Sequence, residues 1–168
     1  PTGDVIQLPK GATPIDFAFA VHTEVGLHCQ GAKVNGRIAP LHRQLRNSDA
    51  VEILTSPSAR PSRDWLAHVR TSRARHRIRQ WLKHEEQRTS AKIGREILDR
   101  EVRRRKLPKP DDAALERASK AFNLNDTTHL IASIGQGDIA MAQVLKELYP
   151  ELVPAATEPP AKPSAFER

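Results

Sequence analysis

The side chains in this sequence that could carry chemistry are its seven histidines, its single cysteine and a dense run of arginines. His22 is the sharpest local candidate, because it lies at the far end of a short predicted helix. An imidazole at that place could close the last turn of the helix, or it could stack on a nucleic-acid base or hydrogen-bond to one. The spacing alone favours the structural role and leaves the binding role open.

Enzymatic chemistry finds little support in the pattern of residues. The sequence has no phosphate-binding loop, no nucleophile elbow and no paired metal ligands at helical spacing. His76 and His84 have no carboxylate partner at their level, so we do not expect a metal site there. Asp111 and Asp112 are interpreted as a helix cap, and Cys29 as a small buried hydrophobic residue. We therefore predict no catalytic residue, metal or cofactor in this chain.

Positive charge is concentrated in the middle third of the sequence. Residues 59–107 carry sixteen basic and six acidic residues, whereas residues 1–58 carry five of each and residues 108–168 carry six basic and nine acidic. Such a field suits a polyanion such as RNA, although a solvated helix face or a contact with an acidic protein would also explain it. The arginines expected to contact an RNA backbone, with little reading of its sequence, are Arg73, Arg75, Arg77 and Arg79.

Turn and capping signals place His22 in a small α+β unit. Residues 4–8 alternate as a strand does, and a Pro/Gly-rich turn follows them. One short helix is predicted to begin at Pro14, which fits the first helical position, and to end before Gly26. The histidine is thus expected to be presented by the end of a helix that a strand and a turn hold in place.

Further signals complete the predicted elements. Asn35-Gly36 predicts a type I′ hairpin turn between strands at 32–34 and 37–39, and residues 50–55 alternate as a last strand. A long basic helix is predicted over residues 72–106. Three shorter helices are expected after it, starting at Asp111-Asp112, at Asp126 or Thr127, and at Ile139.

Bulk properties bound the setting of the protein. No apolar run is long enough to span a membrane, and one cysteine permits no internal disulfide. We therefore expect a cytoplasmic protein in a reducing compartment. Residues 153–168 are rich in proline and alanine, as linkers are, and are expected to be unfolded.

Two segments resemble a TGS domain, most closely that of the long RelA/SpoT proteins, which make and degrade the alarmone (p)ppGpp: GDVIQLPKGATPIDFAFAVHTEVG and GAKVNGRIAPLHRQLRNSDAVEILTSP. The helical domain that follows TGS there resembles the continuation PSRDWLAHVRTSRARHRIRQWLK. The resemblance implies an α+β chain: a β-grasp (ubiquitin-like) TGS domain at 1–58, whose first strand would precede residue 1, then an all-α domain at 59–152 and a linker at 153–168.

The same resemblance implies a role for His22. In ribosome-bound RelA-type proteins the TGS domain encloses the unpaired 3′-CCA end of a deacylated tRNA, and the histidine of its HxxVG motif contacts that end. This motif corresponds to residues 22–26 here, and His28 stands where the family often has a basic arginine. The basic helix would then contact ribosomal RNA. The chain would be a regulatory region, and the catalytic domains of a GTP pyrophosphokinase or (p)ppGpp 3′-pyrophosphohydrolase would precede it.

Two alternatives to tRNA sensing stay open. SpoT-type relatives resemble this sequence equally well, and in them the TGS domain docks acyl carrier protein, a strongly acidic partner. A basic surface that could receive it comprises Lys33, Arg37, Arg43 and Arg46. The other alternative is intramolecular, because TGS and the helices could clamp the upstream catalytic domains and switch them between synthesis and hydrolysis.

Overall fold

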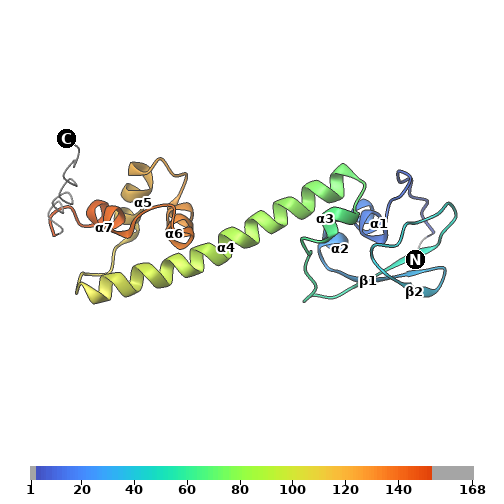
Figure 1. Cartoon of the computed structure of the whole chain (residues 1–168), viewed down its shortest axis with the longest axis horizontal. Helices are drawn as coiled ribbons and strands as arrows, with labels where there is room; N and C mark the ends of the chain where they lie inside the picture. The colour runs from blue at the N-terminus through green and yellow to red at the C-terminus, as the bar shows by residue number, and fades with distance from the viewer. Residues whose placement is uncertain (1–2, 153–168) are drawn as a thin grey trace, which may run out of the picture. The chain divides into compact units, whose positions relative to one another are not determined.

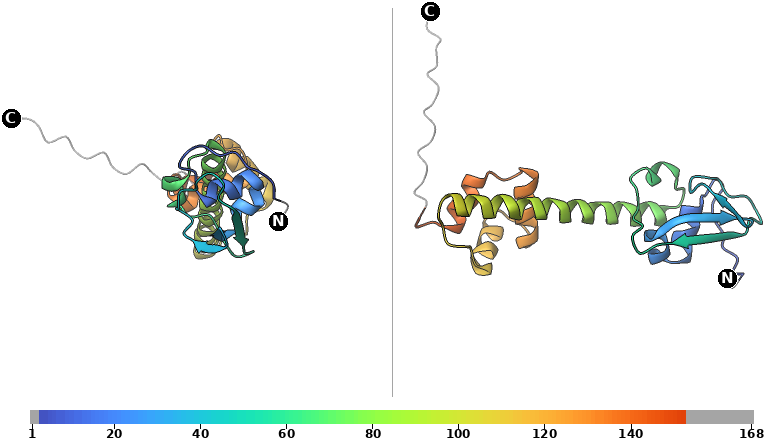
Figure 2. Two further views of the ribbon diagram at one scale, coloured as in Figure 1. Left: turned by 90° about the vertical axis from the view of Figure 1, so that its right-hand side faces the viewer. Right: turned by 90° about the horizontal axis from the view of Figure 1, so that it is seen from below.

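The computed structural model describes residues 3–152, and the predicted linker at 153–168 lies outside the described residues. The chain divides into two compact units, Pro1–Glu86 and Gln87–Arg168, called here the N-terminal and C-terminal units. Figures 1 and 2 show a small sheet with short helices in the N-terminal unit and only helices in the C-terminal one. This is the predicted α+β chain, with a β-grasp-like sheet region followed by an all-helical region.

Three antiparallel strands form the sheet of the N-terminal unit, in the order β2-β1-β3. Strands β1 (Cys29–Val34) and β2 (Arg37–Ala39) pair with Val34 opposite Arg37, and β3 (Val51–Thr55) pairs with the other side of β1. Between β1 and β2, Asn35 and Gly36 have φ angles of 53° and 77°. Positive φ at both positions is the type I′ geometry, so the predicted hairpin is confirmed.

Residues 4–8 are not a strand, contrary to the prediction. The sheet of the described residues does not include them, and the Val5 side chain is 92% exposed. A strand exists only through the hydrogen bonds of a neighbour, which an alternating pattern cannot supply by itself. The segment instead leads irregularly into the turn at Gly11, whose φ of 84° requires glycine.

The predicted single helix is two helices, α1 (Pro14–Val21) and α2 (Thr23–Leu27), and Gly26 lies inside the second rather than beyond the end. His22 separates them with extended angles, φ −160° and ψ 148°. Gly26 serves close packing: a Cβ there would lie 2.4 Å from the ring of Phe19. The prediction that the helix ends before Gly26 was therefore wrong, because this glycine is present to allow contact with Phe19 and not to terminate a helix.

Helix α1 packs on the chain segment that follows the sheet. Ile15 and Phe19 form a buried cluster with Val69, Ala74 and Ile78. These partners come from the segment after α3 (Trp65–His68) and from the first turns of α4 (Ser72–Arg104), which nearly matches the predicted helix 72–106. The N-terminal unit therefore includes the first part of the basic helix as well as the sheet.

The C-terminal unit packs α5 (Asp112–Ala121), α6 (Thr127–Gln136) and α7 (Met141–Leu148) with the later part of α4. Asp111 accepts a 2.7 Å hydrogen bond from the Ala114 N–H, and Asp126 accepts a 2.8 Å bond from the His129 N–H. Both carboxylates are thus N-caps, as the sequence predicted. None of the described helices combines the length and the apolar character that crossing a membrane requires.

Candidate functional site

His22 is presented to solvent at the junction of α1 and α2. Its backbone N–H closes α1 on the Ala18 carbonyl, and its Nδ1 accepts a 3.2 Å hydrogen bond from the Glu24 N–H. An imidazole nitrogen that accepts carries no proton, so the neutral ring has its proton on Nε2. The ring is exposed, and it can therefore donate from Nε2 or stack on a planar ligand. The imidazole therefore does not close the last turn of α1, as the structural interpretation expected, but caps the start of α2 through Nδ1. The rest of the ring is open to solvent, and the binding role stays a prediction.

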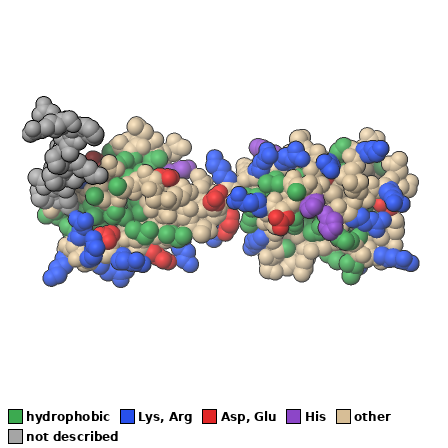
Figure 3. Space-filling model, viewed as in Figure 1, with side chains coloured by type: hydrophobic (Ala, Val, Ile, Leu, Met, Phe, Trp, Pro, Cys, Tyr) green, Lys and Arg blue, Asp and Glu red, His purple; other side chains and the backbone are tan. Residues whose placement is uncertain are grey.

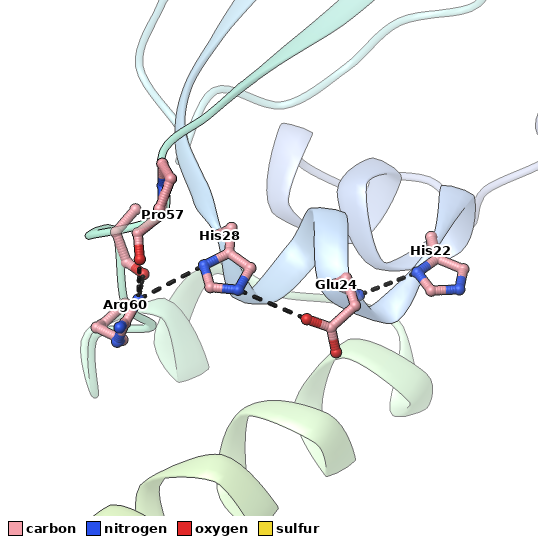
Figure 4. A network of polar contacts seen from close by, with 6 residues as sticks. His22, Glu24, His28, Pro57 and Arg60 are labelled. Carbon is pink, nitrogen blue, oxygen red and sulfur yellow. Dashed lines mark hydrogen bonds and ion pairs between the residues drawn. The ribbon is translucent and has the colours of Figure 1, made fainter.

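His28 belongs to the same polar network. It ends α2, and its Nε2 lies 3.5 Å from the Glu24 carboxylate. Figure 4 shows Glu24 between the two imidazoles, with Arg60 on the far side of His28. The two predicted site histidines thus contact the same residue, His22 at the Glu24 backbone N–H and His28 at the Glu24 carboxylate, and His28 is half-buried whereas His22 is exposed.

Arg60 completes this network, although sequence reasoning did not select it. Its Nη1 lies 3.5 Å from Nδ1 of His28 and donates 2.7 Å hydrogen bonds to the carbonyls of Pro57 and Ala59. Arg60 and His28 are 32 residues apart, so no local pattern could have joined them. In the sequence, Arg60 could have been noticed only as a single arginine in a segment rich in proline and serine.

The basic surface predicted for an acidic partner is partly engaged in ion pairs. Lys33 lies 3.3 Å from Glu52 across the sheet, and Arg43 lies 4.0 Å from Asp49. Hydrogen bonds from the Arg46 N–H and the Asn35 amide lower the pKa of Asp49, so that carboxylate stays ionised. Arg37 and Arg46 are exposed, and they are the members of this set whose charge extends furthest into solvent.

The arginines predicted to contact RNA do not form one uniform row. Arg73, Arg77 and Arg79 are exposed on α4, and Arg77 donates to the neutral amide of Gln80 at 3.1 Å. Arg75 is half-buried and donates to the Val69 carbonyl at 3.0 Å, so part of its guanidinium holds the segment before α4. Figure 3 shows basic side chains spread over the visible face of the N-terminal unit, with histidines among them.

The described part of the chain offers neither a cluster of metal ligands nor a reactive cysteine. Residues 3–152 hold no cluster of three or more histidine, cysteine or carboxylate side chains able to bind a metal. Cys29 is buried, and burial raises the pKa of its thiol to about 11. That thiol is a hydrophobic core residue, as predicted, and not a nucleophile.

Comparisons with known proteins give two family matches within the chain. A family model described as TGS domain matches residues 1–55, and one described as RelA/SpoT AH domain matches residues 81–149. The described sheet and helices α1 and α2 lie within the first match, and α5–α7 lie within the second.

Several curated relatives are similar to the chain over most of its length. A GTP pyrophosphokinase of Myxococcus xanthus is 43% identical over 156 residues, which cover 90% of this chain and 20% of the relative. The bifunctional (p)ppGpp synthase/hydrolase RelA of Mycobacterium tuberculosis is 43% identical over 157 residues, covering 90% and 21%. A guanosine-3′,5′-bis(diphosphate) 3′-pyrophosphohydrolase of Aquifex aeolicus is 41% identical over 151 residues, covering 90% and 21%.

The chain therefore spans about a fifth of the length of the relatives it matches. Both domain matches and these relatives point to one group of proteins. The sheet with α1 and α2 lies in the residues matched by the TGS model, and α5–α7 lie in the residues matched by the AH model. The chain thus carries a TGS domain at residues 1–55 and a RelA/SpoT AH domain at residues 81–149.

Proposed function

We propose that this chain is a regulatory region of a (p)ppGpp synthetase/hydrolase, and that its TGS domain binds the unpaired 3′ end of uncharged tRNA on the ribosome. The observation that carries the proposal is the exposed ring of His22, whose Nδ1 is fixed by the Glu24 N–H while Nε2 faces outward. Unpaired RNA ends are recognised by rings that stack on bases or hydrogen-bond to their edges. A side chain held in one orientation and open to solvent has the properties that such recognition needs.

The catalytic context of the proposal comes from the relatives. They are named as GTP pyrophosphokinase, (p)ppGpp pyrophosphohydrolase or bifunctional (p)ppGpp enzyme, and this chain matches a fifth of their length. The segments of this chain that match family models are a TGS domain and a RelA/SpoT AH domain. A sensing role for these two domains, with synthesis or hydrolysis performed elsewhere in the same protein, is consistent with both facts.

The exposed arginines of α4 would supply sequence-independent attraction to ribosomal RNA. Arg73, Arg77 and Arg79 are exposed, and this helix belongs to the segment with the large surplus of positive charge. Contacts of lysine and arginine with phosphates release counterions and give affinity without reading bases. His22 would provide selectivity for the free 3′ end, because an amino acid attached to the terminal ribose would clash with the TGS residues that enclose that ribose.

The test compares uncharged and aminoacylated forms of one tRNA for binding to the whole protein on stalled ribosomes. The wild type should prefer the uncharged tRNA, and His22→Glu should lose that preference, since the substitution places a carboxylate where the RNA end would lie. His42→Glu is the matched control, because His42 is also exposed and lies in a loop of the same unit. Equal binding of both tRNA forms by the wild type would overturn the proposal.

A second candidate function is docking of acyl carrier protein, and one observation favours it. Ile38 is 82% exposed on the edge strand β2, next to the exposed Arg37. An apolar side chain beside basic ones suits an acidic protein with an apolar contact. A salt-sensitive complex of the purified chain with acyl carrier protein, weakened by Arg37→Glu and by Ile38→Ser, would support this function. No complex at low salt would reject it.

A further inference from the structure

We infer that Arg60 is a phosphate-binding residue of the His22 site, and that it contacts the backbone of the RNA strand whose end His22 receives. The inference rests on the proposed function and adds to it the residue that supplies fixed positive charge. Arg60 lies beside His28 and on the opposite side of that ring from Glu24.

The guanidinium of Arg60 is held in place before any ligand arrives. The Nη1 group donates to the carbonyls of Pro57 and Ala59, both at 2.7 Å. With the His28 Nδ1 at 3.5 Å, three acceptors surround the two Nη1 hydrogens, so Nε–H and the two Nη2 hydrogens are the donors that point to no partner named here. A guanidinium held by backbone carbonyls loses little further rotational freedom when it binds an anion, which favours a fork-shaped contact with phosphate oxygens.

Charge around the site favours an anion at Arg60 rather than at His22. Glu24 lies between the two imidazoles, and its carboxylate would repel a phosphate placed there. Arg60 donates to neutral backbone carbonyls, and the residue is exposed to solvent. A guanidinium is a permanent cation with donors in a fixed fork, which suits a phosphate.

The arrangement therefore separates two tasks along one row of side chains. The ring of His22 is suited to a base or a terminal ribose, and Arg60 is suited to a phosphate further along the strand, with His28 between them. An RNA strand that lies along this row would contact the His22 ring with its 3′ end and Arg60 with a phosphate further from that end. A single-stranded RNA end offers a base or ribose and a backbone phosphate in that order.

The test uses the purified chain and two probes: uncharged tRNA, and the same tRNA trimmed of its terminal CCA. Dissociation constants are measured by fluorescence anisotropy over a series of salt concentrations. We expect Arg60→Ala to weaken binding of intact tRNA roughly tenfold and to reduce the salt dependence of log K by about 0.7, as loss of one single-strand phosphate contact should. Binding of the trimmed tRNA should change little.

Matched variants separate charge from structure. Arg60→Lys should restore the salt dependence but only part of the affinity, because lysine keeps the charge and loses the fork. Arg63→Ala removes the same charge three positions further on, where Arg63 lies 3.9 Å from Glu86, and should have a smaller effect. Arg60→Gln, neutral and polar, should behave as Arg60→Ala if charge decides.

The possible results distinguish the two levels of the proposal. If the wild type binds intact and trimmed tRNA equally, sensing of the 3′ end and the role of Arg60 both fail. If the wild type prefers intact tRNA and His22→Ala abolishes that preference, while Arg60→Ala changes neither affinity nor salt dependence, only the inference about Arg60 is overturned. Loss of affinity in Arg60→Ala without a change in salt dependence would also overturn it, because it would show a structural effect.

Discussion

Asp16 in the first turn of α1 and Thr71, which is 55 residues further along the chain, are joined by two hydrogen bonds of 2.8 Å. The Thr71 N–H and hydroxyl donate to Oδ1 of Asp16, and the Arg70 N–H donates to the same carboxylate at 3.0 Å. The Thr13 N–H and hydroxyl bind it from the other side. One fully buried carboxylate thereby fixes the start of α1 to the start of α4.

Substitution of Asp16 should therefore destabilise the N-terminal unit strongly. Asp16→Ala leaves the part-buried N–H groups of Arg70 and Thr71 and the buried donors of Thr13 without their partner, and we expect a loss of about 3 kcal/mol in the free energy of unfolding. Urea denaturation followed by tryptophan fluorescence measures it, because both tryptophans, Trp65 and Trp81, lie in this unit. Asp64→Ala is the control, since Asp64 is exposed and makes no side-chain cap bond. A loss below about 1 kcal/mol would contradict the assigned role.

The Cys29 thiol should resist alkylation in the folded protein. It is 2% exposed, and burial raises its pKa to about 11. Because the folded state holds the proton more tightly, the thiol's contribution to stability is complete below the ordinary thiol pKa of about 9 and is lost as the pH rises toward 11. Iodoacetamide labelling at pH 8, followed by mass spectrometry, should be slow for the native chain and fast in urea. Equal rates would show that the thiol is accessible.

Gly94 and Gly135 should tolerate no side chain, because they form the crossing of α4 and α6 in the C-terminal unit. A Cβ at Gly94 would lie 1.8 Å from the Ile131 carbonyl oxygen, and one at Gly135 would lie 1.9 Å from that of Ser90. Gly94→Ala must push the helices apart, and we expect a loss of about 3 kcal/mol in unfolding free energy. Thermal unfolding followed by circular dichroism measures it, with Thr89→Ala, an exposed change in the same helix, as control. Unchanged unfolding in Gly94→Ala would exclude this close crossing.

These cases show which parts of the structure the sequence could predict. The Asn35-Gly36 turn and the Asp111 and Asp126 caps follow from short-range chemistry, and the structure confirms them. The strand expected at 4–8 failed because pairing depends on a neighbour. The single helix failed because the chain is extended at His22, and Gly26 is a contact residue inside α2 rather than a terminator.

The candidate site divides in the same way. His22 was predicted because helix ends and motifs are local, and the structure places it, exposed, at a helix junction. Arg60 was missed because its relation to His28 arises only when the loop after β3 folds back beside α2. The packing role of Gly94 could not be predicted from the sequence either, since it depends on a helix that begins more than thirty residues later, at Thr127.

The packing of α2 against α1 should determine the orientation of His22 and His28. Gly26 faces the ring of Phe19, and a Cβ there would lie 2.4 Å from it, so Gly26→Ala must shift α2 away from α1. Since α2 carries His28 at its end and the Glu24 N–H that fixes His22, the variant should lose both stability, by about 2 kcal/mol, and preference for uncharged tRNA. Gly31→Ala is the matched control, because its Cβ would meet Leu54 at an ordinary 3.7 Å. Should Gly26→Ala lose stability and yet keep the preference, the orientation of the histidines would be irrelevant to binding, and the recognition role proposed for them would have to be abandoned.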